Sequence, residues 1–250
     1  MTQGELIPIV LLLLLIFILG AGSFFIFFVM RMARRHRQMF ESGLELRRFY
    51  EHSHRRANRQ NRPLCWLAIR NRSVPAVQAA LGLRNPKPWS WSDGISGERA
   101  IFVAPPVNGW ILVVGGGVPD PSDDVDACFR LVLELSRKLG HAQFFQADPV
   151  LHHHAWACAE AGRILRGYAW AGSTLWNQGA KTDAESRLGL KCFTYGEECG
   201  PERLGMTDLL AANEEKVPLL AARWSIDPAE IHEKVVSGSL GVAGKPGARF

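Results

Sequence analysis

The segment 6–30 constrains what this chain can fold into more than any other part of it. It holds 25 apolar or small residues, and none of them has an ionisable side chain. A helix needs about 20 such residues to cross the hydrocarbon core of a bilayer. Because backbone groups in lipid must be hydrogen-bonded within the span, a single crossing segment has to be helical. The sequence therefore predicts a transmembrane helix over 6–30, after a short N-terminal tail over 1–5.

A cleaved secretory signal is the alternative interpretation of this segment. Such a signal has a basic n-region, an apolar core of about 7–15 residues and a cleavage site with small residues. Residues 1–5 contain one acid and neither Lys nor Arg, and the apolar run continues from Phe24 to Val29 beyond the small residues at 20–23. These differences favour an uncleaved anchor.

Arginine is concentrated directly after the apolar segment. From Arg31 to Arg62 there are ten arginines and three acids, a net charge of +7. Since the whole chain has a net charge of +5, the remainder carries −2. The positive-inside rule then predicts a bacterial inner-membrane protein with its N-terminus outside and its C-terminal domain in the cytoplasm. Nucleic-acid binding is not expected, because it needs basic charge on the folded recognition surface.

The arginines nearest the apolar segment are expected to contact anionic lipid headgroups. They are Arg31, Arg34, Arg35 and Arg37. Phe40, Leu44 and Phe49 recur among the charges at near-helical spacing, which predicts an amphipathic juxtamembrane helix over 31–62. Pro63 ends this helix, because the residue before a proline is disfavoured in the α region. The expected partners are the lipid bilayer, its anionic headgroups and a protein.

Residues 63–236 are predicted to form one cytoplasmic α+β domain, followed by a flexible tail over 237–250. Asn108-Gly109 joins two apolar runs, a pattern that predicts a type I′ hairpin because both turn positions need positive φ. Ala161-Gly162 is expected to join a second hairpin in the same way. Residues 84–98, with two prolines, are expected to be a long loop.

Two helical signals complete the outline of this domain. An apolar stripe over 122–139 predicts an amphipathic helix that Gly140 ends. Thr182 and Glu185 have the spacing of a capping box. From 64 to 146 the expected order is strand, helix, hairpin, helix, strand, which predicts a mostly antiparallel, ferredoxin-like sheet, with further helices near the C-terminus.

The run of three histidines at 152–154 is the most chemically suggestive stretch. Strand alternation would place His152, His154, Cys158 and Glu160 on one face, where two imidazoles, a thiolate and a carboxylate could hold zinc. Trp156 would share that face, and histidines at the start of a strand more often pack or face solvent. A zinc site here is the alternative, and an ordinary strand is favoured.

The remaining candidate residues favour binding over catalysis. Five cysteines, an odd number without a C-x-x-C pair, indicate reduced thiols and neither a disulfide framework nor a zinc ribbon. No serine or cysteine has a nucleophile-elbow motif. Tryptophans in expected loops could form an exposed patch for a peptide or ligand. They are Trp89, Trp91 and Trp176.

These features together predict a non-enzymatic protein-interaction or regulatory module held at the membrane. The alternative is a membrane-tethered, metal-dependent hydrolase that uses His152 and His154. The two hypotheses differ in whether those imidazoles converge on a third ligand in a concave site.

Several short motifs resemble a family of uncharacterised bacterial proteins. They are Pro105-Pro106-Val107-Asn108-Gly109-Trp110-Ile111-Leu112-Val113-Val114-Gly115, Leu135-Ser136-Arg137-Lys138-Leu139-Gly140 followed by Gln143-Phe144-Phe145, His154-Ala155-Trp156, Arg166-Gly167-Tyr168 and Leu175-Trp176-Asn177-Gln178-Gly179. The resemblance covers roughly residues 64–227 and implies a domain that also exists without the N-terminal segment. No established activity comes with it, so it implies no catalytic residue.

Overall fold

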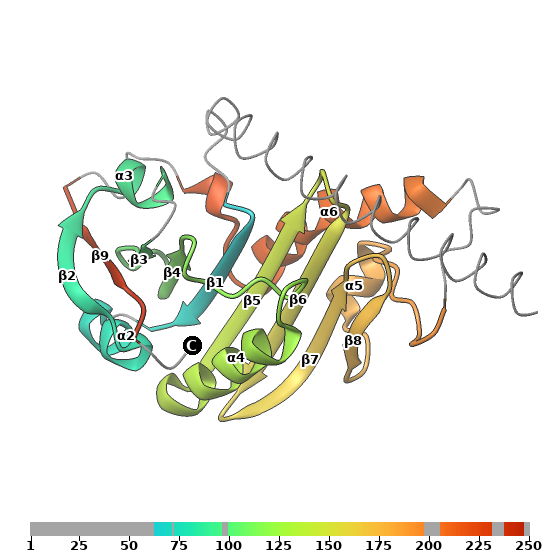
Figure 1. Ribbon diagram of the computed structural model, residues 1–250, viewed down its shortest axis with the longest axis horizontal. Helices are drawn as coiled ribbons and strands as arrows, with labels where there is room; N and C mark the ends of the chain where they lie inside the picture. Colours follow the sequence, from blue (N-terminus) through green and yellow to red (C-terminus); the bar gives the residue numbers. More distant parts are fainter. Residues whose placement is uncertain (1–62, 72, 97–99, 198–205, 232–237, 248–250) are drawn as a thin grey trace, which may run out of the picture. The chain divides into compact units, whose positions relative to one another are not determined.

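The computed structural model describes residues 63–71, 73–96, 100–197, 206–231 and 238–247 (Figure 1). Within these ranges the chain forms one sheet of nine strands, in the order β2-β9-β3-β4-β1-β5-β6-β7-β8. Every neighbouring pair of strands is antiparallel. The predicted mostly antiparallel sheet is therefore present, and it is larger than the sequence indicated.

The described ranges form nine strands and five α-helices. The strands are β1 (Cys65–Arg70), β2 (Arg84–Trp89), β3 (Ile101–Val103), β4 (Trp110–Val114), β5 (His141–Asp148), β6 (His153–Glu160), β7 (Arg163–Trp170), β8 (Thr174–Gln178) and β9 (Gly241–Lys245). The helices are α2 (Val74–Leu81), α3 (Trp91–Ser96), α4 (Val125–Leu139), α5 (Asp183–Arg187), α6 (Met206–Trp224) and a 3-10 turn at Pro228–Glu230.

The centre of the sheet contains the element order that the sequence indicated for 64–146. There β3, β4, β1 and β5 lie side by side, with α2 and α4 as the helical connections of a split βαβ unit. Two elements that the sequence did not indicate, β2 and α3, are inserted between α2 and β3. On one side β9 and β2 extend the sheet, and on the other β6, β7 and β8 extend it as a meander.

Helices bury both faces of this sheet. On one face α4 packs against β1, β5, β6 and β7, and α2 packs against α4. On the other face α6 packs against β5 and β6, with α3 over β3 and β9. Alternation along β1 illustrates the division, since Leu67 and Ile69 belong to the first core while Trp66 and Ala68 belong to the second.

The membrane-spanning part of the predicted fold class is contradicted. Across the described ranges, no helix is long and apolar enough to cross a bilayer. The predicted transmembrane helix over 6–30 and juxtamembrane helix over 31–62, including the headgroup arginines, lie outside the described residues. The fold class is corrected to an α+β domain with an antiparallel sheet, and the single-pass inner-membrane localisation is withdrawn with the prediction on which it rested.

The predictions made from turn and cap residues agree with the observed backbone. Asn108 and Gly109 have φ of 51° and 83°, and Val107 and Trp110 exchange backbone hydrogen bonds of 2.8 and 2.9 Å across the turn. Ala161 and Gly162 have φ of 48° and 75° between β6 and β7. A type I′ turn requires positive φ at both central residues, which is why the Asn-Gly pair predicted such a turn.

Two segments differ from the sequence-based expectation. Residues 84–98 were expected to be a loop, whereas 84–89 form the edge strand β2 and 91–96 form α3. Residues 241–245, expected within a flexible tail, form β9 between β2 and β3. A Cβ on Gly241 would lie 2.4 Å from the ring of Phe102, so the glycine permits a close approach that its sequence context did not reveal.

Candidate functional site

The predicted zinc ligands lie beside different partners in the described domain. His152 precedes β6 with φ of 54°, so strand alternation does not place it with the others. Its Nδ1 lies 3.0 Å from Glu214 Oε1. His154 is fully buried, and its ring stacks on those of Trp156 and Tyr168 at centroid distances of 5.9 Å in both cases.

The other two predicted ligands lie farther along β6. The Sγ of Cys158 is 3.7 Å from His141 Nε2 on β5. Glu160, at the end of the strand, is exposed. Within the described residues there is no group of three or more His, Cys, Asp or Glu side chains that could hold a metal ion.

The three tryptophans of the predicted patch pack against the cores of the domain, Trp91 buried and the other two half-buried. Trp91 is only 3% exposed, and Trp89 packs against the same core on the face that carries α6. Trp176 packs against the opposite core, edge-on to Phe129 of α4 and over Gly167. Two of the three therefore lie on one face of the sheet and the third on the other.

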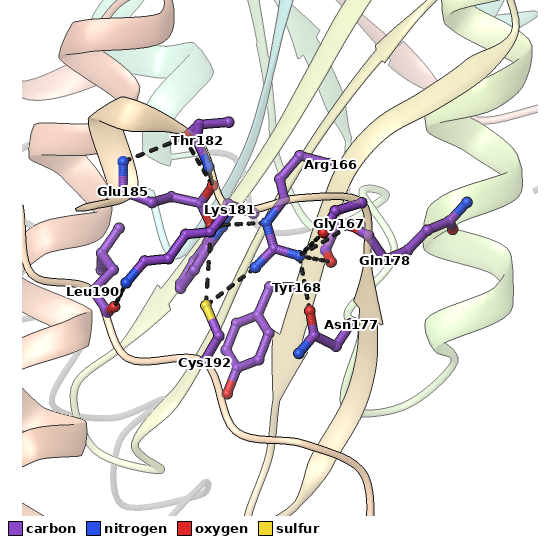
Figure 2. A network of polar contacts seen from close by, with 12 residues as sticks. Arg166, Gly167, Tyr168, Asn177, Gln178, Lys181, Thr182, Glu185, Leu190 and Cys192 are labelled. Atoms are coloured by element: carbon purple, nitrogen blue, oxygen red, sulfur yellow. Dashed lines mark hydrogen bonds and ion pairs between the residues drawn. The ribbon is translucent and has the colours of Figure 1, made fainter. Parts of the chain in front are cut away.

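A buried ion pair holds α5 against the sheet (Figure 2). Arg166 on β7 is 2% exposed, Glu185 on α5 is 0% exposed, and Arg166 Nε donates to Glu185 Oε1 over 2.8 Å. Trp156 Nε1 donates to the same oxygen over 2.7 Å. The second carboxylate oxygen accepts from the backbone N and the hydroxyl of Thr182, at 2.7 and 2.8 Å. The predicted capping box is present, and its glutamate also balances a buried charge.

The two terminal nitrogens of the Arg166 guanidinium are also hydrogen-bonded (Figure 2). Its Nη1 donates to the carbonyl of Gly167 at 2.9 Å, to Asn177 Oδ1 at 2.8 Å and to the carbonyl of Gln178 at 2.9 Å. Its Nη2 donates to Cys192 Sγ at 3.1 Å. Burial raises the pKa of the Cys192 thiol to about 11, so this sulfur is protonated at neutral pH. The network ties together β7, β8, α5 and the segment around 192.

The contact between His152 and Glu214 is the strongest candidate for a functional role. The turn before His152 is fixed by Asp148, whose Oδ1 accepts from the backbone N of Val150 at 2.9 Å and of Leu151 at 3.1 Å. This side-chain turn brings His152 into the left-handed region, which β-carbon-bearing residues seldom adopt. The imidazole is 42% exposed, whereas the Glu214 side chain is 4% exposed.

Glu214 reaches this position because α6 is amphipathic. Its buried positions include Asn213, Glu214, Val217, Leu220 and Ala221, a stripe at helical spacing toward the sheet. Asn213 connects two further parts of the domain. Its Nδ2 donates to the carbonyl of Lys191 at 2.7 Å and lies 3.1 Å from His154 Nε2.

The charge states of Glu214 and His154 depend on how far burial removes each side chain from water. Burial raises the pKa of Glu214 to about 7, the nearby His152 opposes this shift, and Asp148 and Glu215 add to it. Burial lowers the pKa of His154 to about 3, so that imidazole is neutral. A carboxyl whose pKa lies near neutrality, beside a half-exposed imidazole, can exchange a proton with solvent in the physiological range.

Sequence reasoning found half of this pair. His152 was among the candidate residues for its neighbours in the chain, whereas Glu214 was not among them. The two residues are 62 positions apart, and only the packing of α6 on the sheet joins them. The inward stripe on α6, in which Asn213 and Glu214 occupy core positions, was the signal that could have identified Glu214.

Comparison of the chain with protein-family models, with curated proteins and with solved structures gives no match.

Proposed function

We propose that the described domain is a regulatory module that binds another protein, and that the His152–Glu214 contact controls how α6 is held against the sheet. The observation that carries this proposal is the 3.0 Å contact between a half-exposed imidazole and a buried carboxyl on different elements. The β5–β6 turn and α6 are joined by it, so a change in its charge state changes the attachment of the helix.

The direction of the pH response follows from the thermodynamic linkage between proton binding and folding. The pKa of Glu214 is raised in the folded domain, so the folded state binds its proton more tightly than an opened state does. This stabilising effect is complete below the ordinary carboxyl pKa and is lost as the pH rises through about 7. Above that pH the buried carboxylate is charged beside Asp148 and Glu215, and local release of α6 becomes easier.

The four cysteines in the described ranges are poor candidates for a catalytic nucleophile. Burial raises the pKa of Cys158 and of Cys192 to about 11, and raises the pKa of Cys65 and Cys128 well above its usual range. The thiolate is the nucleophilic form of cysteine, and burial disfavours it at these four positions.

The two edges of the sheet are unsuited to pairing with another strand. β2 contains Pro86 and Pro88, which have no N–H to donate. On β8 the backbone N of Asn177 donates to the Tyr195 hydroxyl at 2.8 Å, and its side chain donates to the Phe193 carbonyl at 3.1 Å. A protein partner is therefore expected on a helical surface, and the outer side of α6 presents Leu219, 52% exposed, between the exposed Glu215 and Arg223.

Hydrogen–deuterium exchange of the full-length chain tests this proposal. After correction for the intrinsic exchange rate, we expect the protection of α6 amides to fall between pH 5 and pH 7.5, by at most about tenfold per pH unit. In Glu214→Gln, which keeps the shape but cannot ionise, this fall should disappear. Unchanged protection of α6 in the unsubstituted chain over that range would overturn the proposal.

Glu215→Gln is the matched control, since it removes an exposed carboxylate one residue away on the same helix. It should keep the pH response and shift it slightly to lower pH, because the charge of Glu215 raises the pKa of Glu214. A loss of the response in this variant as complete as in Glu214→Gln would assign the effect to general helix charge and contradict the role of the specific contact.

A further inference from the structure

An open pocket lies where β1 ends and the turn between β3 and β4 begins. Its volume is about 460 Å³, within the range of small-molecule sites. The residues that line it are Arg70, Asn71, Asn108, Gly109 and Trp110. None of these residues belongs to α6 or to the β5–β6 turn, so the inference does not rest on the function proposed above.

The register of the sheet explains why these residues meet. Arg70 on β1 and Trp110 on β4 are directly opposite each other in an antiparallel pair, so their side chains leave the sheet on the same face. The Asn108-Gly109 turn then brings a side-chain amide and a backbone without a Cβ to the rim. The pairing of β1 with β4 fixes the positions of Arg70 and Trp110, and the type I′ turn fixes that of Asn108-Gly109.

The tryptophan ring has a fixed position beside the pocket. It packs edge-on against the imidazole of His141, with centroids 5.5 Å apart and an interplanar angle of 74°. His141 is itself held by Gln143, whose Nε2 lies 2.9 Å from its Nε2 and 3.3 Å from the carbonyl of Trp224. The aromatic wall of the pocket is therefore supported by β5 and, through Gln143, by the end of α6.

The lining has the chemistry of an anion site with an aromatic wall. Arg70 is exposed, and within the described part of the chain its guanidinium makes no hydrogen bond or ion pair. Among the lining residues it is the charged one, and none is acidic. A guanidinium presents a planar fork that matches a carboxylate or phosphate, while an indole ring stacks on flat ring systems.

We propose that this pocket binds a small anion that carries an aromatic ring, with the acid group at Arg70, the ring against Trp110 and a polar substituent within reach of Asn108. The acid group can be a carboxylate or a phosphate, since both pair with a guanidinium in the same way. Ring and charge have to be present together, because neither the indole nor the guanidinium alone offers an enclosed site.

Isothermal titration of the purified full-length chain tests this with three probes: benzoate, which has ring and charge, inorganic phosphate, which has charge alone, and benzamide, which has the ring alone. We expect saturable binding of benzoate, at least about tenfold tighter than that of the other two. Arg70→Gln should weaken benzoate binding by about tenfold or more, because the charged hydrogen bonds are lost.

Two further variants make the test specific. Asn108→Gly keeps the positive φ of the turn while removing the amide, and should weaken binding less than Arg70→Gln does. Arg163→Gln, at an exposed arginine on β7, should leave binding unchanged. The proposal is overturned if benzoate shows no saturable binding, if phosphate or benzamide binds as tightly, or if Arg70→Gln binds benzoate like the unsubstituted chain.

Discussion

His154 shows how strongly packing decides the charge of one side chain. Its ring is fully buried against Trp156 and Tyr168, and burial lowers its pKa to about 3. In the unfolded chain the imidazole takes up a proton below its ordinary pKa of about 6.5. The folded state therefore loses stability as the pH falls from about 6.5 toward 3, opposite in sign to the effect of Glu214.

Substitution of His154 by Phe should remove this dependence while keeping an aromatic ring in the stack. At pH 7 we expect the variant to be less stable than the unsubstituted chain, because Asn213 loses a hydrogen-bond partner. Below pH 6.5 the difference in the free energy of unfolding between the two proteins should decrease, by at most about 1.4 kcal/mol per pH unit. Urea denaturation of both proteins at pH 7, 6 and 5 measures this difference in the free energy of unfolding. A difference that grows on acidification would contradict the lowered pKa of His154.

The cysteines give a second prediction about single residues. In Cys65, Cys128, Cys158 and Cys192 burial disfavours the thiolate, so they should react slowly with iodoacetamide at pH 7.5. We expect each to be modified at less than about a tenth of the rate seen in the urea-unfolded chain. Peptide mapping by mass spectrometry measures the rates site by site. Fast native modification of Cys192 would show that its contact with Arg166 activates the thiol.

At the level of elements, α5 depends on one carboxylate with two roles. Glu185 caps its own helix through Thr182 and neutralises Arg166 on β7. Helix α5 is a short helix at Asp183–Arg187, so it depends on tertiary contacts, which are these polar contacts and the packing of Ala184 against the core on the α6 face.

Glu185→Gln should therefore be strongly destabilising. It leaves the buried guanidinium without a counter-charge, a change that costs about 3–5 kcal/mol. Glu134→Gln is the control, since Glu134 forms an exposed pair with Lys138 at 3.9 Å and should cost less than about 1 kcal/mol. Urea denaturation compares the two, and a similar small loss in both would mean that the buried pair adds little to stability.

Short sequence patterns predicted the elements that are stabilised by residues close to each other in the chain. The Asn108-Gly109 turn and the Thr182–Glu185 capping box are encoded within four residues each, and both are present. β9 and β2 are different, because their sequences contain glycines or prolines and depend on pairing with each other across the chain. Their formation is a tertiary effect that a pattern in one segment does not contain.

The same reasoning applies to the candidate sites. Arg166 and Glu185 lie 19 residues apart, and His152 and Glu214 lie 62 apart, so neither pair has a spacing motif. The predicted zinc site at 152–160 rested on strand alternation that included His152, whereas β6 begins at His153 and His152 lies in the turn before it. The tryptophans in expected loops were assigned to a patch, whereas the extra elements β2 and α3 place Trp89 and Trp91 against the core.

At the scale of the whole molecule, the sheet is covered by helices on both faces and has two protected edges. Two hydrophobic cores hold the sheet and its helices together. Helix α6 is attached in part through two titratable side chains, His152 and Glu214. The regulatory proposal therefore depends on the ionisation of a single buried carboxyl near neutral pH.

Carbon-13 NMR of the Glu214 side-chain carboxyl tests this claim most directly. The full-length chain is labelled at glutamate Cδ, and the Glu214 signal is identified by its loss in Glu214→Gln. Titration from pH 3 to 9 should give a midpoint near 7 for this signal, while exposed glutamates titrate near about 4.3. A midpoint for Glu214 at the value of an exposed glutamate would contradict the account.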